Sequence, residues 1–308
     1  MGFQAMVNRA LVFAFALTSV VVLSGCGEPA PAKVTANRAN GNSLREHFNE
    51  DGANAGSAAA ALPDPTGFAT LVGSFKIDGE PPELAPLVVS GNDASFCGSP
   101  LNEQLVIGED GEIRDILIYL NTKIPQDNPL WEHESYAIDQ GAVLSGNRIF
   151  DQKQCVFLSH VYAMRTGQTL QVVNSDSVGH NTNISGGPNF NLGVGATENY
   201  SPSKQTNQPV SIVCGVHPWM KANLLVRDNP YFAVTDSNGR FEIKNIPAGV
   251  ELEFRVWQEK KGFLGNVSVS NGDGNFTQET WKKGRFKLAL EPGQTVTRDV
   301  KINATEFN

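Results

Sequence analysis

The chain is poor in metal-binding side chains, in positive charge and in helical patterning. Its 308 residues include only 4 Cys, 5 His and 4 Met, and 32 acidic residues outnumber 24 Lys and Arg. A net charge of −8 argues against nucleic-acid binding, which needs a basic surface. Amphipathic helical periodicity is nearly absent, whereas short alternating segments separated by Gly, Asn and Pro recur. The sequence therefore predicts an all-β protein, long enough for two domains.

The N-terminus holds the one long apolar run. Arg9 precedes an apolar stretch at 10–23, which has the length of a signal peptide and is short for a spanning helix of roughly 20 residues. Leu23-Ser24-Gly25-Cys26 resembles a bacterial lipobox. We therefore expect a signal peptide at 1–25, lipid on Cys26 and a flexible tether at 26–66, rich in small and polar residues. This would anchor the protein to a bacterial membrane, facing the periplasm or the cell surface. An uncleaved anchor is the alternative.

One short segment concentrates the residues that bind soft metals. Cys214-Gly215-Val216-His217-Pro218-Trp219-Met220 places a thiolate, an imidazole and a thioether three residues apart. His180, upstream, supplies a second imidazole. Two His, one Cys and a weak Met ligand form the donor set of a blue-copper electron-transfer site. Both segments follow alternating stretches, so the ligands are expected near strand ends. The alternative is a buried structural thiol at Cys214 and a surface loop residue at His217.

These residues resemble the cupredoxin family, and the spacing of Cys214, His217 and Met220 is similar to the amicyanin form of its ligand loop. The resemblance implies a Greek-key β-sandwich and one type 1 copper, bound strongly by His180, Cys214 and His217 and weakly by Met220. It also implies that Asn181 tethers the ligand loop. His217 would lie near the surface as the electron port, and Pro218 and Trp219 would form an apolar docking patch.

The remaining cysteines are assigned by counting. With Cys26 lipidated and Cys214 bound to copper, Cys97 and Cys155 are left in an exported chain, where disulfides persist. We predict a disulfide between Cys97 and Cys155, and two separate buried thiols are the alternative. Met164 is expected in the core, and His160 is expected outside the metal site.

Two domains follow the tether. Residues 67–227 are expected to form the cupredoxin-like domain with an N-terminal β extension and a long insertion at 121–143. At 228–308, the segment Thr235-Asp236-Ser237-Asn238-Gly239-Arg240-Phe241 and a Pro-Ala-Gly turn at 247–249 resemble the carboxypeptidase-regulatory-like β-sandwich. Such domains are structural, so no peptidase activity follows. Trp257 and Trp281 are candidates for an aromatic binding platform.

The whole arrangement also resembles lipoproteins of planctomycete-type bacteria that are labelled methylamine-utilisation-like. The pattern predicts a membrane-tethered carrier of single electrons rather than an enzyme. A pairing of Cys214 as nucleophile with His217 as base is disfavoured because no oxyanion-stabilising device is visible. The five histidines do not suffice for a second, catalytic copper. A cytochrome or a dehydrogenase is the expected redox partner, with no nucleic acid. The alternative is a surface-tethered interaction module, or one that binds or delivers copper without redox turnover.

Overall fold

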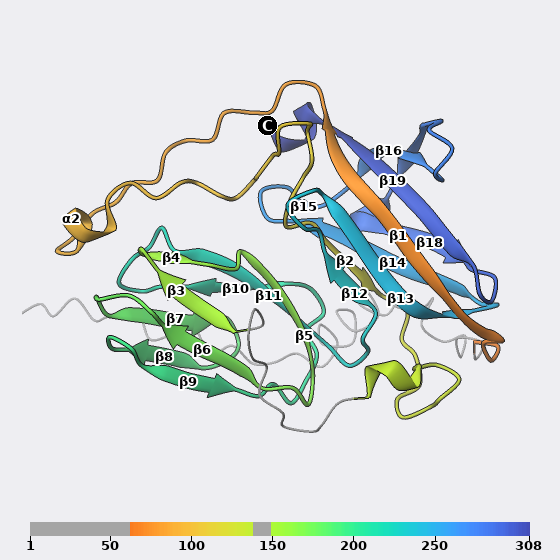
Figure 1. Ribbon diagram of the computed structural model, residues 1–308, viewed down its shortest axis with the longest axis horizontal. Helices are drawn as coiled ribbons and strands as arrows, with labels where there is room; N and C mark the ends of the chain where they lie inside the picture. Colours follow the sequence, from red (N-terminus) through yellow and green to blue (C-terminus); the bar gives the residue numbers. More distant parts are fainter. Residues whose placement is uncertain (1–61, 138–148) are drawn as a thin grey trace, which may run out of the picture. The chain divides into compact units, whose positions relative to one another are not determined.

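The computed structural model describes residues 62–137 and 149–308, and their regular secondary structure is almost entirely β-strand (Figure 1). The predicted all-β class is confirmed. The expected signal peptide, Cys26 and all but the last residues of the expected tether lie outside the described part of the chain. Within that part, no helix is both long and apolar enough to cross a membrane.

Residues 150–227, here called the insert domain, form two facing sheets. The first has the strand order β5-β11-β10-β7-β8 and the second has the order β4-β3-β6-β9. Parallel pairs β5–β11 and β3–β6 occur within otherwise antiparallel sheets. The strands are β3 (Phe150–Lys153), β4 (Val156–Phe157), β5 (Val161–Arg165), β6 (Leu170–Asn174), β7 (His180–Ile184), β8 (Asn189–Leu192), β9 (Thr197–Tyr200), β10 (Val210–Val213) and β11 (Lys221–Arg227).

A second sandwich, here called the split domain, combines residues 65–78 and 105–136 with residues 228–308. Its sheets have the orders β13-β1-β19-β16-β17 and β12-β2-β14-β15, and β18 pairs with β14. The elements are β1 (Gly67–Asp78), β2 (Leu117–Leu120), η1 (Glu134–Tyr136), β12 (Phe232–Val234), β13 (Arg240–Ala248), β14 (Glu251–Gln258), β15 (Gly262–Phe263), β16 (Asn266–Ser270), β17 (Thr277–Thr280), η3 (Lys282–Gly284), β18 (Arg285–Ala289), β19 (Thr295–Asn303) and η4 (Ala304–Phe307).

This pairing differs from the predicted division at residue 227. β1 is antiparallel to β13 and parallel to β19, while β2 lies between β12 and β14. The N-terminal segment therefore completes the C-terminal sandwich instead of extending the cupredoxin-like domain. The physical reason is burial, because Leu71 and Phe75 of β1 join the same core as Ile243 and Val300. Alternation identifies a strand but does not reveal which sheet it joins.

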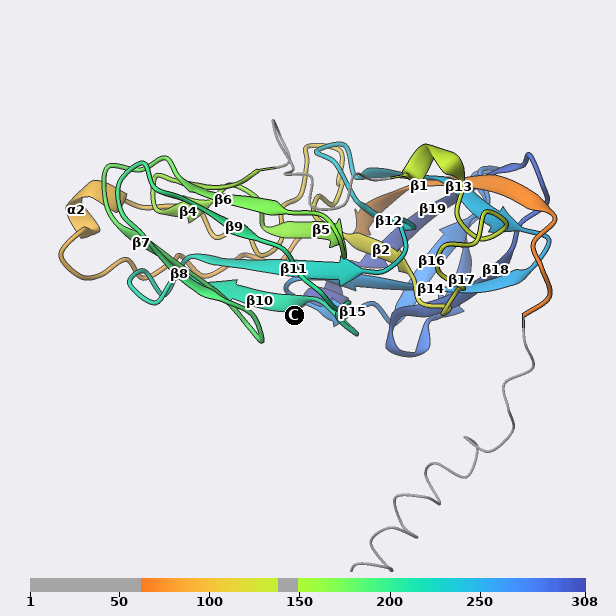
Figure 2. The same ribbon diagram turned by 90° about the horizontal axis from the view of Figure 1, so that it is seen from below.

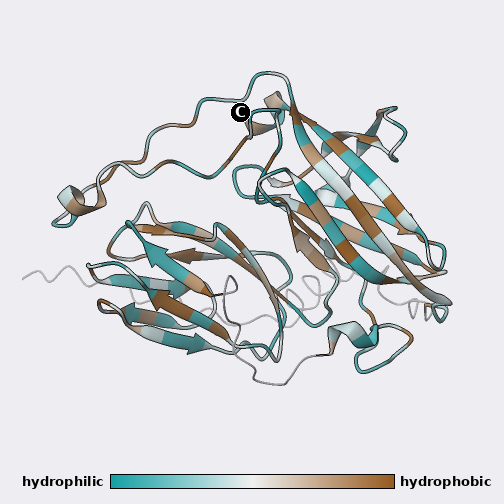
Figure 3. Ribbon diagram, viewed as in Figure 1, coloured by the Kyte–Doolittle hydropathy of each residue, from teal (hydrophilic) through white to brown (hydrophobic). Residues whose placement is uncertain are grey.

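The cores follow the alternation of the strands, which Figure 3 shows as hydrophobic and hydrophilic residues succeeding one another along the split domain. In β13, Phe241 and Ile243 are buried while Arg240, Glu242 and Lys244 are exposed. The described part of the expected insertion, 121–137, packs on this core through Ile124 and Trp131. Trp281 is also buried there, so it offers no exposed platform.

The turn in the Thr-Asp-x-x-Gly-x-Phe segment connects two sheets. The Asp236 side chain accepts hydrogen bonds from the backbone N–H groups of Asn238 (2.8 Å) and Arg240 (2.9 Å), and Gly239 has a φ of 67°. A Cβ at Gly239 would lie 2.5 Å from the carbonyl oxygen of Phe75, so glycine is required by both conformation and space. The chain thereby passes from β12 in one sheet to β13 in the other.

Residues 79–104, here called the arm, connect β1 to the rest of the split domain. The arm carries the short helix α2 (Ala94–Cys97) at its far end (Figures 1 and 2). Leu87, Val89 and Cys97 pack against the core of the insert domain. The arm thus belongs to the split domain in sequence but contacts the insert domain.

His160 binds acidic side chains of both other regions. Its Nε2 lies 3.1 Å from Glu103 of the arm and its Nδ1 lies 3.2 Å from Glu259 of the split domain. Burial lowers the pKa of His160, but the hydrogen bonds to the two carboxylates outweigh this and raise the pKa to about 9. The protonated imidazole therefore links the three regions at neutral pH.

We predict a pH-dependent contribution of His160 to stability. Because the folded-state pKa of about 9 lies above the ordinary 6.5, the contribution is complete below pH 6.5 and is lost as the pH rises to about 9. Urea unfolding should show wild type exceeding His160→Gln by on the order of 2 kcal/mol at pH 6 and by much less at pH 9.5. A difference that stays constant over this range would contradict the ion-pair assignment.

Candidate metal centre

The predicted ligands come together at one end of the insert domain. His180 begins β7, and β7 is paired with β10, which ends directly before Cys214. β10 and β11 form a hairpin whose connection is the segment 214–220. The N–H of Cys214 donates to the carbonyl of Met220 (3.2 Å), and the N–H of Met220 donates to the carbonyl of His217 (2.9 Å). These bonds fold the connection tightly, so residues three apart in sequence face a common point.

Three of the four predicted ligands present their donor atoms to one another. The Nδ1 atoms of His180 and His217 are 2.9 Å apart, and Cys214 Sγ is 3.8 Å from His217 Nδ1. The donor atoms of all three residues lie within 4.8 Å of each other. The three residues are only 1–3% exposed. Such a cluster fits a metal ion bound by two imidazoles and a thiolate.

Hydrogen bonds on the outer nitrogens fix which ring nitrogens are free. His180 Nε2 is 2.6 Å from an Asp176 carboxylate oxygen, and His217 Nε2 is 3.2 Å from one of Asp93. Since an ionised carboxylate only accepts, each Nε2 must carry the proton, and a neutral imidazole then has its lone pair on Nδ1. With this tautomer two lone pairs face each other inside the protein, an arrangement that a cation between them would stabilise. The residues fit the copper ion that the family resemblance implies.

The protonation state of His180 suits this role. Burial lowers its pKa, and the opposing effect of the hydrogen bond that it donates to Asp176 does not overcome that of burial. The imidazole is therefore neutral at pH 7, which leaves a lone pair available for a metal.

Backbone donors surround the sulfur of Cys214. The N–H groups of Asn181 and His217 point at Sγ over 3.3 and 3.4 Å. The Asn181 side chain accepts from the N–H of Gly215 (3.1 Å) and donates to the carbonyl of Phe190 (3.1 Å). Asn181 thereby connects β7 to the ligand loop. The two N–H groups are placed where they would stabilise and orient the sulfur of Cys214 as a metal ligand.

The surface around His217 differs from the expectation. His217 is 2% exposed and does not form an open electron port. Trp219 is also buried, with its Nε1 donating to the carbonyl of Cys155 (3.1 Å) and its ring 5.0 Å from that of His217. Pro218 is exposed, and so is Val216. The predicted Pro218–Trp219 docking patch is therefore wrong for Trp219, which packs inward beneath the disulfide-linked arm.

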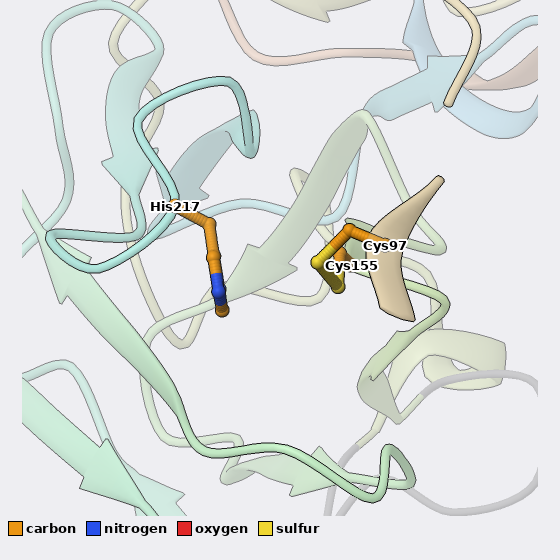
Figure 4. A group of neighbouring side chains, drawn as sticks. All are labelled: Cys97, Cys155 and His217. Atoms are coloured by element: carbon orange, nitrogen blue, oxygen red, sulfur yellow. A yellow bond between two sulfur atoms is a disulfide. The ribbon is translucent and has the colours of Figure 1, made fainter. Parts of the chain in front are cut away.

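The predicted disulfide between Cys97 and Cys155 is confirmed, and it lies against the centre. Figure 4 shows it beside the imidazole of His217, with Cys97 contributed by α2 and Cys155 by the turn between β3 and β4. Its sulfurs lie within 4.8 Å of one ring nitrogen of His217. As half-cystines, Cys97 and Cys155 offer no thiolate, so this grouping is a neighbour of the metal site and not a second one.

Two carboxylates of the site escaped sequence reasoning. Asp176, buried, accepts from the N–H groups of Gln154 (2.6 Å) and Cys155 (2.8 Å) as well as from His180. The only feature of the sequence that could have indicated the contact between Asp176 and His180 is their separation of four residues. Asp93 comes from the arm, and no spacing in the sequence relates it to His217. Carboxylates on the outer nitrogen of a ligand histidine orient the ring and make it a stronger donor.

The remaining candidates lie as follows. Met220 is buried in the insert-domain core next to the ligand loop, and its role as axial ligand stays a prediction. Met164 is fully buried in the same core, as expected. His160 binds Glu103 and Glu259, as described above, and is not one of the residues that group with Cys214.

Comparison with known proteins gives structural likenesses alone. No family model matches the chain, and no curated protein matches it. A copper-containing nitrite reductase from Thermus scotoductus SA-01 is 21% identical over 25% of this chain and 22% of its own, with a TM-score of 0.22. A purple cupredoxin from Nitrosopumilus maritimus is 23% identical over 23% of this chain and 80% of its own, with a TM-score of 0.20.

An oxidised amicyanin variant is 14% identical over 30% of this chain and 87% of its own, with a TM-score of 0.24. The chain thus spans about a fifth of the nitrite reductase that it matches. Because all three scores are low, the function is inferred below from the geometry of the site.

We predict that Asn181→Ala destabilises the metal-free protein by about 1–3 kcal/mol, because it leaves the N–H of Gly215 without its acceptor and removes several other hydrogen bonds. Urea unfolding provides the measurement. Asn183→Ala, on the same strand but exposed, is the matched control and should cost no more than about 0.5 kcal/mol. Equal losses in both variants would contradict the tethering role of Asn181.

Proposed function

We propose that this protein carries single electrons through one type 1 copper site, held by His180, Cys214 and His217 with Met220 as a weak fourth ligand. The observation that supports this proposal is the facing pair of Nδ1 lone pairs beside the Cys214 sulfur in a buried site. A soft thiolate with two imidazoles selects copper over harder ions. When bound, copper would supply the cycle between its two oxidation states.

The residues around the site would make electron transfer fast, because they hold the ligand side chains in nearly the same positions in both oxidation states. Asp176 and Asp93 fix the two imidazole rings from outside, and backbone N–H groups fix the Cys214 sulfur. Hydrogen bonding around the thiolate also tunes the potential of such a site. Burial of all three strong ligands excludes water, so no solvent ligand has to be gained or lost with the electron.

We further propose a redox partner protein, such as a cytochrome or a dehydrogenase, and a lipid on Cys26 that tethers the protein to a membrane facing the periplasm or cell surface. Electron-transfer interfaces are small and weak, which suits exposed apolar residues such as Val216 and Pro218 on the ligand loop. The likeness to methylamine-utilisation proteins leaves the donor open. Mass spectrometry of the mature N-terminus would test the lipid at Cys26.

A second candidate function is copper binding or delivery without redox turnover. It is favoured by the closure of the His217 edge, which is covered where a docking partner would need access. The two functions differ in reversibility. A carrier should be reduced and reoxidised repeatedly without losing copper, whereas a delivery protein should release Cu(I) to an acceptor.

We predict that titration with copper(II) gives about one bound copper per chain with an intense visible band from thiolate-to-copper charge transfer and a narrow hyperfine splitting in electron paramagnetic resonance. Cys214→Ser should lose the band because the thiolate is gone. His160→Gln removes a histidine outside the site and should keep the band. Weak, colourless binding by the wild type would overturn the proposal, and retention of the band in Cys214→Ser would reassign the ligand.

A further inference from the structure

The outer edge of His217 is closed by a side chain from a distant part of the sequence. Asp93 Oδ2 lies 3.2 Å from His217 Nε2, although the two residues are 124 positions apart. The imidazole is buried, while the Asp93 side chain is 35% exposed. A partly solvated carboxylate therefore separates the buried ligand from water. Asp176, the carboxylate partner of His180, is by contrast buried, with 3% of its side chain exposed.

Asp93 is held in place through the disulfide. The backbone carbonyl of Asp93 accepts from the N–H groups of Phe96 and Cys97, both at 2.9 Å. Cys97 is bonded to Cys155, which in turn is fixed by its N–H donation to Asp176. The arm around Asp93 otherwise has little regular structure, so the disulfide is the covalent link that keeps Asp93 against His217.

We propose that Asp93 is a positioning residue of the metal centre and that the disulfide-bound arm is its cap. This rests on the proposed copper function. Asp93 accepts a hydrogen bond from Nε2–H of His217, which orients the ring and strengthens Nδ1 as an electron-pair donor. A stronger donor stabilises the more highly charged Cu(II) more than Cu(I), so Asp93 lowers the reduction potential. The cap also keeps external reagents away from the His217 edge.

The first test is the reduction potential of the copper-loaded variants. Asp93→Asn keeps the size of the side chain and removes the charge, and we expect the relative preference for Cu(II) to fall about tenfold, which for one electron raises the potential by about 59 mV. Asp93→Glu should recover most of the wild-type value. Asp64→Asn, an exposed aspartate outside the site, removes the same charge and should leave the potential unchanged. Equal shifts in Asp93→Asn and Asp64→Asn would show a general charge effect and overturn the proposal.

The second test needs no copper. In the metal-free protein, diethyl pyrocarbonate modification mapped by mass spectrometry should find His217 protected in the wild type. It should find His217 at least tenfold more reactive in Asp93→Ala and after mild reduction of Cys97–Cys155, with the circular dichroism spectrum unchanged. Ready modification of His217 in the wild type would overturn the cap. Failure to bind copper, with His217 still protected by Asp93, would overturn the proposed function and leave the capping contact standing.

Discussion

The meeting of three electron-pair donors at one buried point is the constraint around which the insert domain is built. This arrangement costs free energy in the absence of a metal, because buried lone pairs that face one another repel and a buried thiolate needs compensating hydrogen bonds or charge. The protein supplies that compensation at a distance. Asp176 and Asp93 accept hydrogen bonds from the outer N–H groups of the two imidazoles, and the N–H groups of Asn181 and His217 point at the sulfur. The donors are thus prepared for a cation, and the short hairpin connection 214–220 brings them together.

The same centre also ties together segments that the sequence keeps far apart. The insert domain interrupts the sequence of the split domain, and the arm contacts the insert domain through Leu87, Val89 and the disulfide. Asp93 of the arm thereby contacts His217, a predicted metal ligand in the insert domain. His160 of the insert domain also connects these regions, because it contacts both Glu103 of the arm and Glu259 of the split domain. Electrostatic contacts, one covalent bond and the packing of Leu87 and Val89 on its core join the arm to the insert domain.

Local pattern was enough to predict the all-β class, the grouping of His180, Cys214 and His217, and the disulfide, because each depends on a few residues close in sequence or on counting. The spacing of Cys214, His217 and Met220 expresses the geometry of a single tight turn. Sheet membership was not predictable, because the alternation of β1 is the same whichever sheet it joins, and its partners β13 and β19 lie more than 150 residues away. The cap was missed for a similar reason. Exposure of His217 depends on Asp93, and nothing near either residue signals the contact.

The measurement that tests the central claim most directly is anomalous diffraction at the copper absorption edge from crystals of the protein loaded with one equivalent of copper. The account predicts one strong peak, bonded to the Nδ1 atoms of His180 and His217 and to the sulfur of Cys214, with the Nε2 atoms still facing Asp176 and Asp93. A peak anywhere else, or none among these three donors, would contradict it.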